Sequence, residues 1–358
     1  MRKHLHNAFM TDNPSIGEID RIFMAFDFPE RVVHGGTGKL QREKTHKNVL
    51  DFSASTNPYP PAFAWTPNLH DLSYYPDDNY TELKERIGKI FRRDPSEICV
   101  GNGSIELIRV FCSAVFRDPS REKLFFADMP TFGEYSLSAC LAGAKQTCKP
   151  EKADVVFLCN PNNPTGTLKK KADVLTRLCS HKESGSILFC DEAFIELSDP
   201  HQSVADVRDP NLFVLRSLTK SFSVPGIRFG YGFGDAILIE QIETARSPWT
   251  INAFAESYAM EALLHIDELA ASRVAIDRER SWLVAQITSL GLICSPSSVN
   301  FLLVHCGRNV SSLCEGLAQN SIIVRDCTSF GLPECIRIAV RTHEENTRLI
   351  EVLAACVH

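Results

Sequence analysis

Short apolar runs alternate with helical patterns from Ile98 to the middle of the chain. The runs ICVG, KLFFA, DVVFLC, ILFC and LFVLRS are each about four to six residues long, and polar or glycine-rich residues follow each of them. Short strands separated by helices are typical of βαβ units and a mostly parallel sheet. We therefore predict an α/β protein with a ligand site at the carboxyl ends of these strands.

A different pattern follows Ser247. Residues 252–264 and 267–290 have the spacing of long helices, and a last helix is predicted over residues 344–357. Between them, NFLLVHC, SIIVRDC and CIRIAVR have the composition of three strands, which favours a small α+β domain. The predicted division is an N-terminal segment joining the small domain and the cleft (1–50), a large domain (51–266) and a small domain (267–358).

Charge, cysteine usage and the first residues narrow the class of protein. The formal net charge of −6 and the pI near 6.0 give no electrostatic footprint for nucleic acid. The 13 cysteines include no C-x-x-C pair, so we expect a reducing compartment, no disulfide framework and no metal site. MRKHLHNAFMTDNPS lacks the apolar core of a signal peptide, and no apolar run is long enough to span a membrane. We expect a cytoplasmic protein.

Lys220 lies in an unusual place, shortly after the apolar run that ends at Leu215. Ser217 and Thr219 precede it, and Arg228 follows eight residues later. An amine attacks a carbonyl only after losing its proton, so partial burial and a neighbouring cation favour the reactive form. Arg228 would supply that cation and also grip a phosphate with two hydrogen bonds. The alternative is an exposed lysine in a loop after a strand.

Two further motifs, GNGSIE and PTFGEY, follow predicted strands. In GNGSIE a glycine turn opens a helix, so the amides of Ser104 and Ile105 would lie at a helix N-terminus, which attracts anions. In PTFGEY, Phe132 would be placed to stack on a flat aromatic cofactor. Glycine turns are common after strands, and Phe132 also suits a core position, so neither motif alone identifies a site.

NPNNPTG and DEAF are more specific signals. Two prolines make NPNNPTG a rigid loop that would aim the amide of Asn163. DEAF places Asp191 at the end of an apolar strand, where a buried carboxylate needs a cationic partner. A protonated pyridine nitrogen is such a partner, and the alternative is that Asp191 caps a helix.

A glycine-rich stretch near the start, HGGTGK, is only superficially a phosphate loop. The Walker motif needs four residues between its first glycine and the Gly-Lys pair, with serine or threonine afterwards, whereas Leu40 follows Lys39 here. The amides of Gly35 and Gly36 would nevertheless form a nest for a phosphate, with His34 as an additional donor.

Taken together, GNGS, PTF, NPNNPTG, DEAF, SLTK and GIRFGYG occur in the order and spacing of fold-type I pyridoxal-phosphate (PLP) enzymes. The chain resembles this family from His34 to its last helix. The resemblance implies PLP as cofactor and a large domain with a mostly parallel seven-stranded sheet. It implies that Lys220 bonds the cofactor aldehyde, Asp191 lies under the pyridine nitrogen, Asn163 contacts the phenolic oxygen and Phe132 stacks on the ring. The residues expected at the cofactor phosphate are Gly103, Ser104, Ile105, Ser217, Thr219 and Arg228.

The same resemblance implies a homodimer and a set of substrate contacts. Tyr75 would reach the PLP phosphate of the neighbouring subunit, so that the two active sites are shared. Arg337 would receive the substrate carboxylate, and Arg325 would be a second substrate arginine. The other expected substrate contacts are His34, Gly35, Gly36, Ser55 and Asn163.

Within the family, the chain is most similar to threonine-phosphate decarboxylases of cobalamin biosynthesis and to histidinol-phosphate aminotransferases. HGG, DFSAxxNP and DEAFI are decarboxylase motifs, and the aminotransferases usually have tyrosine where Phe194 stands. Ser55 replaces the asparagine of the decarboxylase pattern, which leaves both threonine phosphate and serine phosphate open. We expect decarboxylation of L-threonine O-3-phosphate or L-serine O-phosphate to aminopropanol phosphate or ethanolamine phosphate. The alternatives are an aminotransferase of the histidinol-phosphate type and a PLP-fold protein that binds without catalysis.

Overall fold

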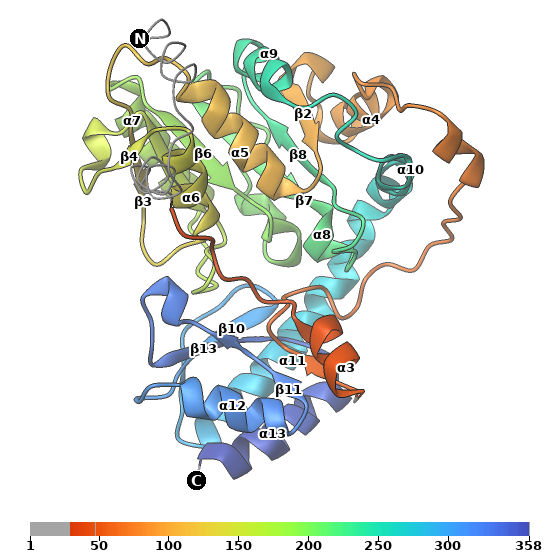
Figure 1. Cartoon of the computed structure of the whole chain (residues 1–358), viewed down its shortest axis with the longest axis vertical. Coiled ribbons are helices and arrows are strands. Elements are labelled where there is room, and N and C mark those ends of the chain that lie inside the picture. The colour runs from red at the N-terminus through yellow and green to blue at the C-terminus, as the bar shows by residue number, and fades with distance from the viewer. Residues whose placement is uncertain (1–28, 47, 358) are drawn as a thin grey trace, which may run out of the picture. The chain divides into compact units, whose positions relative to one another are not determined.

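The computed structural model describes residues 29–46 and 48–357. Much of the predicted N-terminal segment, 1–50, therefore lies outside the described residues. Everything reported below belongs to one compact unit, Val32–His358. Its strands form a seven-stranded, a four-stranded and a two-stranded sheet, which Figure 1 shows in sequence colours.

The seven-stranded sheet is built mainly from the apolar runs. Its strands, in spatial order, are β2 (Ile98–Gly101), β8 (Gly230–Phe233), β7 (Leu212–Ser217), β6 (Ile187–Asp191), β5 (Val155–Cys159), β3 (Leu124–Ala127) and β4 (Lys145–Gln146). β8 pairs antiparallel with β2 and β7, and every other neighbouring pair is parallel. The predicted α/β class and mostly parallel seven-stranded sheet are confirmed.

Each face of this sheet packs against its own layer of helices. Phe189 and Phe213 belong to the core on one face, whereas their chain neighbours Leu188 and Val214 belong to the core on the other. Successive side chains of a strand point to opposite faces, which explains why these strands are apolar along their whole length. The first layer contains α5 (Ser104–Val115), α6 (Glu134–Leu141) and α9 (Ala236–Ala245), and the second contains α4 (Thr81–Phe91), α7 (Lys171–Lys182) and α10 (Ala253–Ala262).

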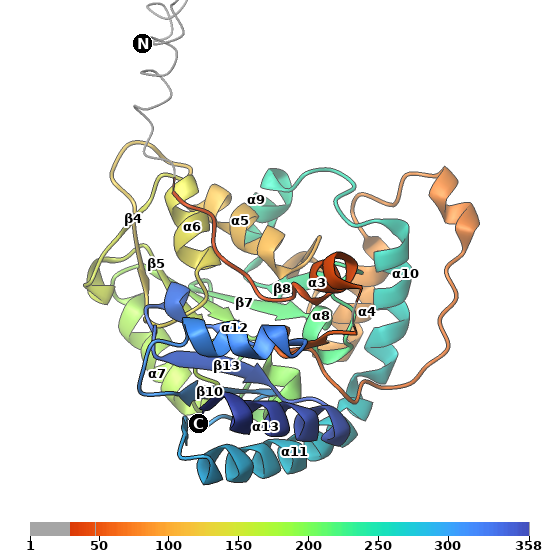
Figure 2. The same ribbon diagram turned by 60° about the horizontal axis from the view of Figure 1, so that its bottom comes forward.

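A four-stranded antiparallel sheet lies in the C-terminal part of the chain. Its spatial order is β12 (Arg325–Asp326), β13 (Cys335–Ala339), β10 (Phe301–His305) and β9 (Ile293–Cys294). The accompanying helices are α11 (Leu269–Ser289), α12 (Ser311–Gln319) and α13 (His343–Val357). Figure 2 shows α11 and α13 side by side next to this sheet. The long helices predicted after Ser247 are confirmed, with ends that differ by a few residues.

The prediction of a single strand over SIIVRDC is wrong. The segment forms two short strands in different sheets, because β11 (Ile322–Ile323) pairs in parallel with β1 (Leu50–Asp51) whereas β12 pairs with β13. The partner strand β1 is more than two hundred residues away in the sequence. Local apolar periodicity carries no information about such a pairing.

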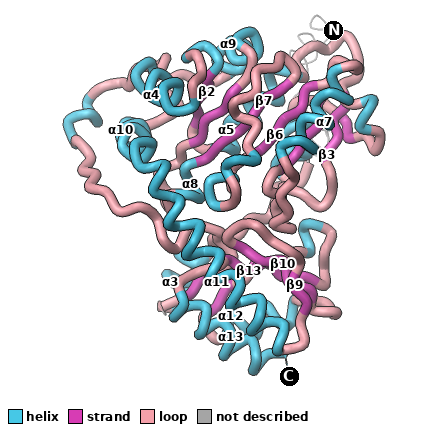
Figure 3. Tube along the Cα trace, turned by 180° about the vertical axis from the view of Figure 1, so that it is seen from behind, coloured by secondary structure: helices cyan, strands magenta, loops and turns pink. Residues whose placement is uncertain are grey.

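Between β1 and α4 the chain makes a long excursion with little regular structure, and Figure 3 shows it looping away from the rest of the described fold. Leu69, Leu72, Tyr74 and Tyr75 on this excursion are all exposed by more than half of their surface. Exposed apolar side chains gathered on one segment are typical of a surface that contacts another chain.

Candidate active site

One cavity of about 470 Å³ gathers nearly all of the residues singled out in the sequence. It lies where β5, β6 and β7 end, beside the N-terminus of α5 and between β12, β13 and the segment that precedes α3 (Gly38–Thr45). Only Gly103 and Tyr75 of the predicted site residues are outside its lining. The predicted residues that line it are His34, Gly35, Gly36, Ser55, Ser104, Ile105, Phe132, Asn163, Asp191, Ser217, Thr219, Lys220, Arg228, Arg325 and Arg337.

Lys220 faces this cavity from α8 (Leu218–Ser221), a single helical turn that follows β7. Ser217 caps that turn, since its hydroxyl accepts a hydrogen bond of 3.3 Å from the amide of Thr219. Burial lowers the pKa of Lys220 to about 8, and the positive charges of Arg337 and Arg228 contribute to the decrease. A sizeable fraction of the amine is therefore neutral near physiological pH, as attack on a carbonyl requires.

Asp191 ends β6 and is almost completely buried. One carboxylate oxygen accepts a hydrogen bond of 2.6 Å from the Tyr135 hydroxyl, and the other accepts one of 2.9 Å from the Ala193 amide. Burial raises the pKa of Asp191, and the Tyr135 hydrogen bond offsets part of that rise. Within the described part of the chain no cationic side chain forms an ion pair with Asp191, so a protonated ring nitrogen would complete its environment.

The N-terminus of α5 and the guanidinium of Arg228 form a cradle for an anion. Gly103 precedes the helix with φ near +80°, and no side chain caps the first amides, those of Ser104 and Ile105. A Cβ atom on Gly103 would lie 2.4 Å from Nη2 of Arg228, and one on Gly230 would lie 2.5 Å from the Ser104 nitrogen. Glycine is required at both positions, and free amides beside a guanidinium suit a phosphate.

Arg337 is buried at the opposite side of the cavity, on β13. Its guanidinium donates hydrogen bonds to the side-chain oxygen of Asn163 and, at 3.0 Å, to the backbone oxygen of Ser53. It lies 5.1 Å from the ring centroid of Phe301. Nε has no hydrogen-bond partner among the described residues, and burial lowers the pKa of Arg337 to about 10. A buried arginine without a carboxylate partner is suited to an anionic ligand.

Arg325, on β12, is the second buried arginine of the cavity. Its Nη2 donates hydrogen bonds of 2.6 Å to the backbone oxygen of Val33 and to the hydroxyl of Ser329. The guanidinium also lies over the ring of Phe330. These contacts hold Arg325 in place without neutralising its charge.

The segment His34–Gly36 is held against the chain just after β1. The Gly36 amide donates a hydrogen bond of 2.8 Å to the Ser53 hydroxyl, and Gly36 has φ near +83°. A Cβ on Gly35 would lie 2.4 Å from the backbone oxygen of Ser53, so no larger residue fits there. Nearby, Ser55 lines the cavity with a buried hydroxyl that has no hydrogen-bond partner in the described residues.

Phe132 and Phe194 also line the cavity. The ring of Phe132 lies 5.6 Å from that of Tyr135, edge to face, and 5.9 Å from that of His34. Phe194 is buried against Phe301 in an edge-to-face contact at 5.1 Å. Phe194 presents no hydroxyl to this part of the cavity.

Tyr75 lies away from the cavity, on the exposed excursion before α4. It is 79% exposed, and its ring centroid lies 4.5 Å from that of Trp249, another exposed aromatic residue. Its predicted contact with the cofactor phosphate of a neighbouring subunit stays a prediction.

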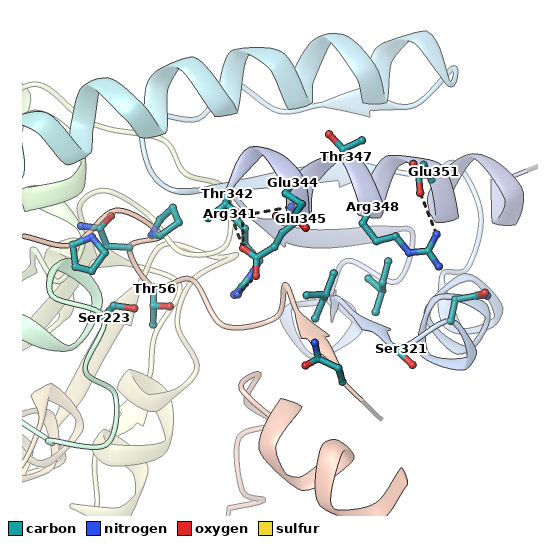
Figure 4. Close-up of a pocket in the computed structure, with 17 residues that line it drawn as sticks. Thr56, Ser223, Ser321, Arg341, Thr342, Glu344, Glu345, Thr347, Arg348 and Glu351 are labelled. Atoms are coloured by element: carbon teal, nitrogen blue, oxygen red, sulfur yellow. Dashed lines mark hydrogen bonds and ion pairs between the residues drawn. The ribbon is translucent and has the colours of Figure 1, made fainter. Parts of the chain in front are cut away.

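A larger groove, of about 1090 Å³, lies beside α13 (Figure 4). The chemistry of its lining differs from that of the cavity around Lys220. Its two arginines are paired with glutamates of that helix, Arg341 with Glu345 at 2.6 Å and Arg348 with Glu351 at 3.1 Å. None of the residues predicted to carry chemistry lines it. The cavity around Lys220 is therefore the candidate active site.

The described residues contain neither a candidate membrane span nor a candidate metal site. None of the helices found there combines the length and the apolar character needed to cross a bilayer. The same residues contain no cluster of three or more histidine, cysteine, aspartate or glutamate side chains suited to a metal ion.

Asp191 at the end of β6, Lys220 just after the neighbouring parallel strand β7, and an anion cradle at the N-terminus of α5 are arranged as in fold-type I PLP enzymes. The chain belongs to the aminotransferase class I and II family, whose sequence profile matches residues 47–353. It is 33% identical to histidinol-phosphate aminotransferase 2 of Archaeoglobus fulgidus, over 88% of this chain and 95% of that protein. It is 32% identical to a putative threonine-phosphate decarboxylase of Caldanaerobacter subterraneus, over 82% and 86%.

A solved structure of a similar protein has the same fold as this chain. The histidinol-phosphate aminotransferase of Clostridium acetobutylicum superimposes with a TM-score of 0.75 and 28% identity, covering 86% of this chain and 99% of that one. Members of the family use PLP. The residues of the cavity fit this group, since Lys220, the buried Asp191 and the cradle around Gly103 match its aldehyde, its ring nitrogen and its phosphate in chemistry.

Three contributors to the site were absent from the sequence prediction: Tyr135, Ser53 and Ser329. Tyr135 follows Phe132 by one helical turn within PTFGEY, and that spacing was a usable signal. Ser53 is bonded to Gly36 and to the distant Arg337, whereas Ser329 is bonded to Arg325, four residues before it. No local pattern distinguishes such serines from others.

Proposed function

We propose that the chain is an aminotransferase of the histidinol-phosphate type, which moves an amino group between a phosphorylated amine and a 2-oxo acid. The observation that carries this proposal is the pair of buried arginines, Arg325 and Arg337, in one cavity with Lys220. The relatives named histidinol-phosphate aminotransferase support the same reaction.

An aminotransferase must accept two different amino donors in one cavity. Glutamate brings a carboxylate at both ends, whereas a phosphorylated amine brings a phosphate at the far end. A guanidinium binds a carboxylate or a phosphate with the same paired hydrogen bonds. In this proposal Arg337 holds the carboxylate next to the amine, and Arg325 holds either distal anion, with the amides of Gly35 and Gly36 and the ring of His34 nearby.

The chemistry divides between the cofactor and the side chains of the cavity. Bound PLP supplies an electron sink for the bond that breaks at the substrate α-carbon. Lys220 bonds the cofactor aldehyde and, when released, moves a proton at that carbon through Nζ, for which a pKa of about 8 is suitable. Asp191 would stabilise positive charge on the ring nitrogen. The side-chain oxygen of Asn163 accepts a hydrogen bond from Arg337, so its amide group would be free to donate to the phenolic oxygen.

Decarboxylation of threonine phosphate or serine phosphate is the second candidate. It is favoured by Phe194, which leaves this side of the cavity without the hydroxyl usual in the aminotransferases, and by the 32% identical putative decarboxylase. With both ends of a phospho-amino acid fixed, rotation about the α-carbon decides whether hydrogen or the carboxylate is placed to leave. Ser55, with its free hydroxyl, is proposed to contact the substrate in either reaction.

One experiment separates the two reactions. Holoenzyme is incubated with histidinol phosphate and 2-oxoglutarate, and in parallel with threonine phosphate and with serine phosphate. Glutamate formation without CO₂ release supports the aminotransferase, and CO₂ release without any need for 2-oxoglutarate supports the decarboxylase. Neither product from any substrate contradicts both proposals. Borohydride reduction followed by peptide mass analysis tests the covalent link to Lys220 independently.

The proposal also includes a homodimer with shared active sites and the division of the chain into two domains. The exposed apolar residues around Tyr75 and Trp249 support contact with a second copy. The strands of the seven-stranded sheet all lie within residues 98–233 and those of the four-stranded sheet within 293–339, which supports domains of 51–266 and 267–358.

A further inference from the structure

Glu134 is a buried carboxylate beside the candidate active site that the reaction itself does not use. It is the first residue of α6, two positions after Phe132, and only 4% of its side chain is exposed. Its Oε1 lies 2.8 Å from Nε2 of His34, which lines the cavity, and its Oε2 lies 3.4 Å from a guanidinium nitrogen of Arg109 on α5. The pKa of Glu134 is lowered, first by the hydrogen bond with His34 and further by both positive partners.

The contact with Glu134 determines which hydrogen-bonding role is left for the other nitrogen of His34. A carboxylate accepts, so Nε2 of His34 must donate to it. In the neutral ring Nδ1 is then an acceptor, which repels an anionic oxygen, whereas in the protonated ring Nδ1 is a donor. Among the described residues no hydrogen bond to Nδ1 is found.

The distal half of the cavity is suited to a doubly charged anion. Nη2 of Arg325 donates a hydrogen bond to the Val33 oxygen, one residue before His34, so the guanidinium is held beside the segment that carries the His34 ring. Glu134 of α6 contacts His34 and is itself contacted by Arg109 of α5, and Arg325 of β12 is hydrogen bonded to the residue before His34. The other charged residues that line the cavity are Asp51, Asp191, Lys220, Arg228 and Arg337.

We propose that Glu134 is a positioning residue that holds His34 as a donor to the distal phosphate and so makes the cavity prefer a phosphate to a carboxylate at that end. This inference rests on the proposed function, because it deepens the assignment of the distal subsite. In both candidate reactions the substrate carries a phosphate there.

The test measures binding rather than turnover. The holoenzyme is titrated calorimetrically with 3-phosphonopropionate and with succinate, two amine-free ligands that share a carboxylate and differ in the second anion. Glu134→Gln is expected to weaken phosphonate binding about tenfold or more, as for loss of a charge-assisted hydrogen bond, and succinate binding less than about threefold. Arg109→Gln is the matched control, because it leaves the contact between Glu134 and His34 in place, and it is expected to change neither ligand by more than about twofold.

Non-additivity distinguishes this role from a merely structural one. His34→Gln is expected to lower the preference for phosphonate over succinate about as much as Glu134→Gln does, and the double variant Glu134→Gln/His34→Gln is expected to lower it no further, because Glu134 acts through His34. Glu134→Asp, which keeps the charge and shortens the reach, provides a second variant should Glu134→Gln not fold, and it is expected to lose part of the preference.

Equal losses for phosphonate and succinate, additive effects of Glu134→Gln and His34→Gln in the double variant, or wild-type affinities in both single Glu134 variants would overturn the inference. The proposed function fails by a different result, the absence of product in the turnover assays. If the protein shows no turnover but still prefers phosphonate to succinate through Glu134, only the proposed function is refuted. If the protein turns over substrate but lacks this preference, only this inference is refuted.

Discussion

Arg325 and Arg337 are direct partners in the register of β12 and β13, so two buried guanidinium groups lie opposite each other on adjacent antiparallel strands. Like charges in this position destabilise a sheet. The lowered pKa of Arg337 has burial as its main cause, and repulsion by Arg325 adds to it. Neither arginine has a carboxylate partner within the described residues. A locally unfavourable arrangement of this kind is expected where a protein binds an anion.

Arg337→Met is therefore expected to weaken substrate binding without lowering the stability of the protein. Loss of the guanidinium removes the contact with the carboxylate next to the amine of glutamate or of a phospho-amino acid, and is expected to lower kcat/KM for that substrate by about 10²-fold or more. The ligand-free protein is expected to keep its Tm or to gain stability, because a buried, partly unsatisfied charge is replaced by an apolar side chain. Steady-state kinetics and calorimetry test the two halves.

Arg341→Met is the matched control for that substitution. Arg341 pairs with Glu345 and lines the separate groove beside α13. Its loss is expected to lower Tm and to leave KM unchanged. Should Arg337→Met destabilise the protein as much as Arg341→Met without affecting KM, the role assigned to Arg337 is wrong.

Lys220 is expected to make the free energy of unfolding of the cofactor-free protein depend on pH. Its folded-state pKa of about 8 is below the ordinary value of 10.5, so the unfolded chain binds more protons between these two values. The free energy of unfolding should therefore rise with pH across that window, by at most about 1.4 kcal/mol per pH unit from this group. Denaturant titrations of wild type and Lys220→Met measure it, and the difference in slope should vanish below about pH 7. Parallel curves throughout the window would contradict the assignment.

Tyr135→Phe is predicted to impair catalysis through Asp191. The 2.6 Å hydrogen bond from Tyr135 lowers the pKa of the buried Asp191. The variant removes this hydrogen bond, so the pKa of Asp191 rises and more of the carboxyl group becomes protonated. A neutral Asp191 stabilises a charged ring nitrogen poorly, and we expect kcat/KM to fall about tenfold. The measurement is kcat/KM as a function of pH, with the loss smallest at high pH, where the carboxyl group is ionised again.

Tyr80→Phe is the control for this prediction. Tyr80 is also fully buried, and its hydroxyl exchanges hydrogen bonds with the backbone of Ile251, outside the cavity lining. Both variants are expected to lose roughly 1 kcal/mol or more of stability. Only Tyr135→Phe should change the pH profile of kcat/KM.

The sequence was sufficient for the part of the site that follows single strands. Asp191 ends one apolar run and Lys220 follows another by a few residues, and those runs are strands β6 and β7 of the central sheet. A short apolar run followed by polar residues is a local pattern, and strand ends on one edge of a parallel sheet meet in space. Local information therefore placed these residues together.

Other features depend on contacts between distant segments, which local patterns do not encode. β8 runs antiparallel in an otherwise parallel sheet, and its sequence, GYGF, alternates glycine with aromatic residues instead of forming an apolar run. The position of Ser53, which accepts from Gly36 and from Arg337, depends on the pairing of β1 with β11. Glu134 in PTFGEY had no visible partner until the fold brought His34 to it.

Complementation between two inactive variants tests the shared site. Tyr75→Ala is expected to lower activity about tenfold or more by removing a contact to the neighbouring cofactor, and Lys220→Met to abolish it. When the two chains are mixed before assembly, half of the dimers are mixed, and each mixed dimer has one site with both Lys220 and the Tyr75 of the other chain. About one quarter of the wild-type activity should return, given a two-fold symmetric dimer. If Tyr75 acted within its own subunit, every site with Lys220 would lack it, and mixing would restore nothing. Size-exclusion chromatography of each variant checks that both still dimerise.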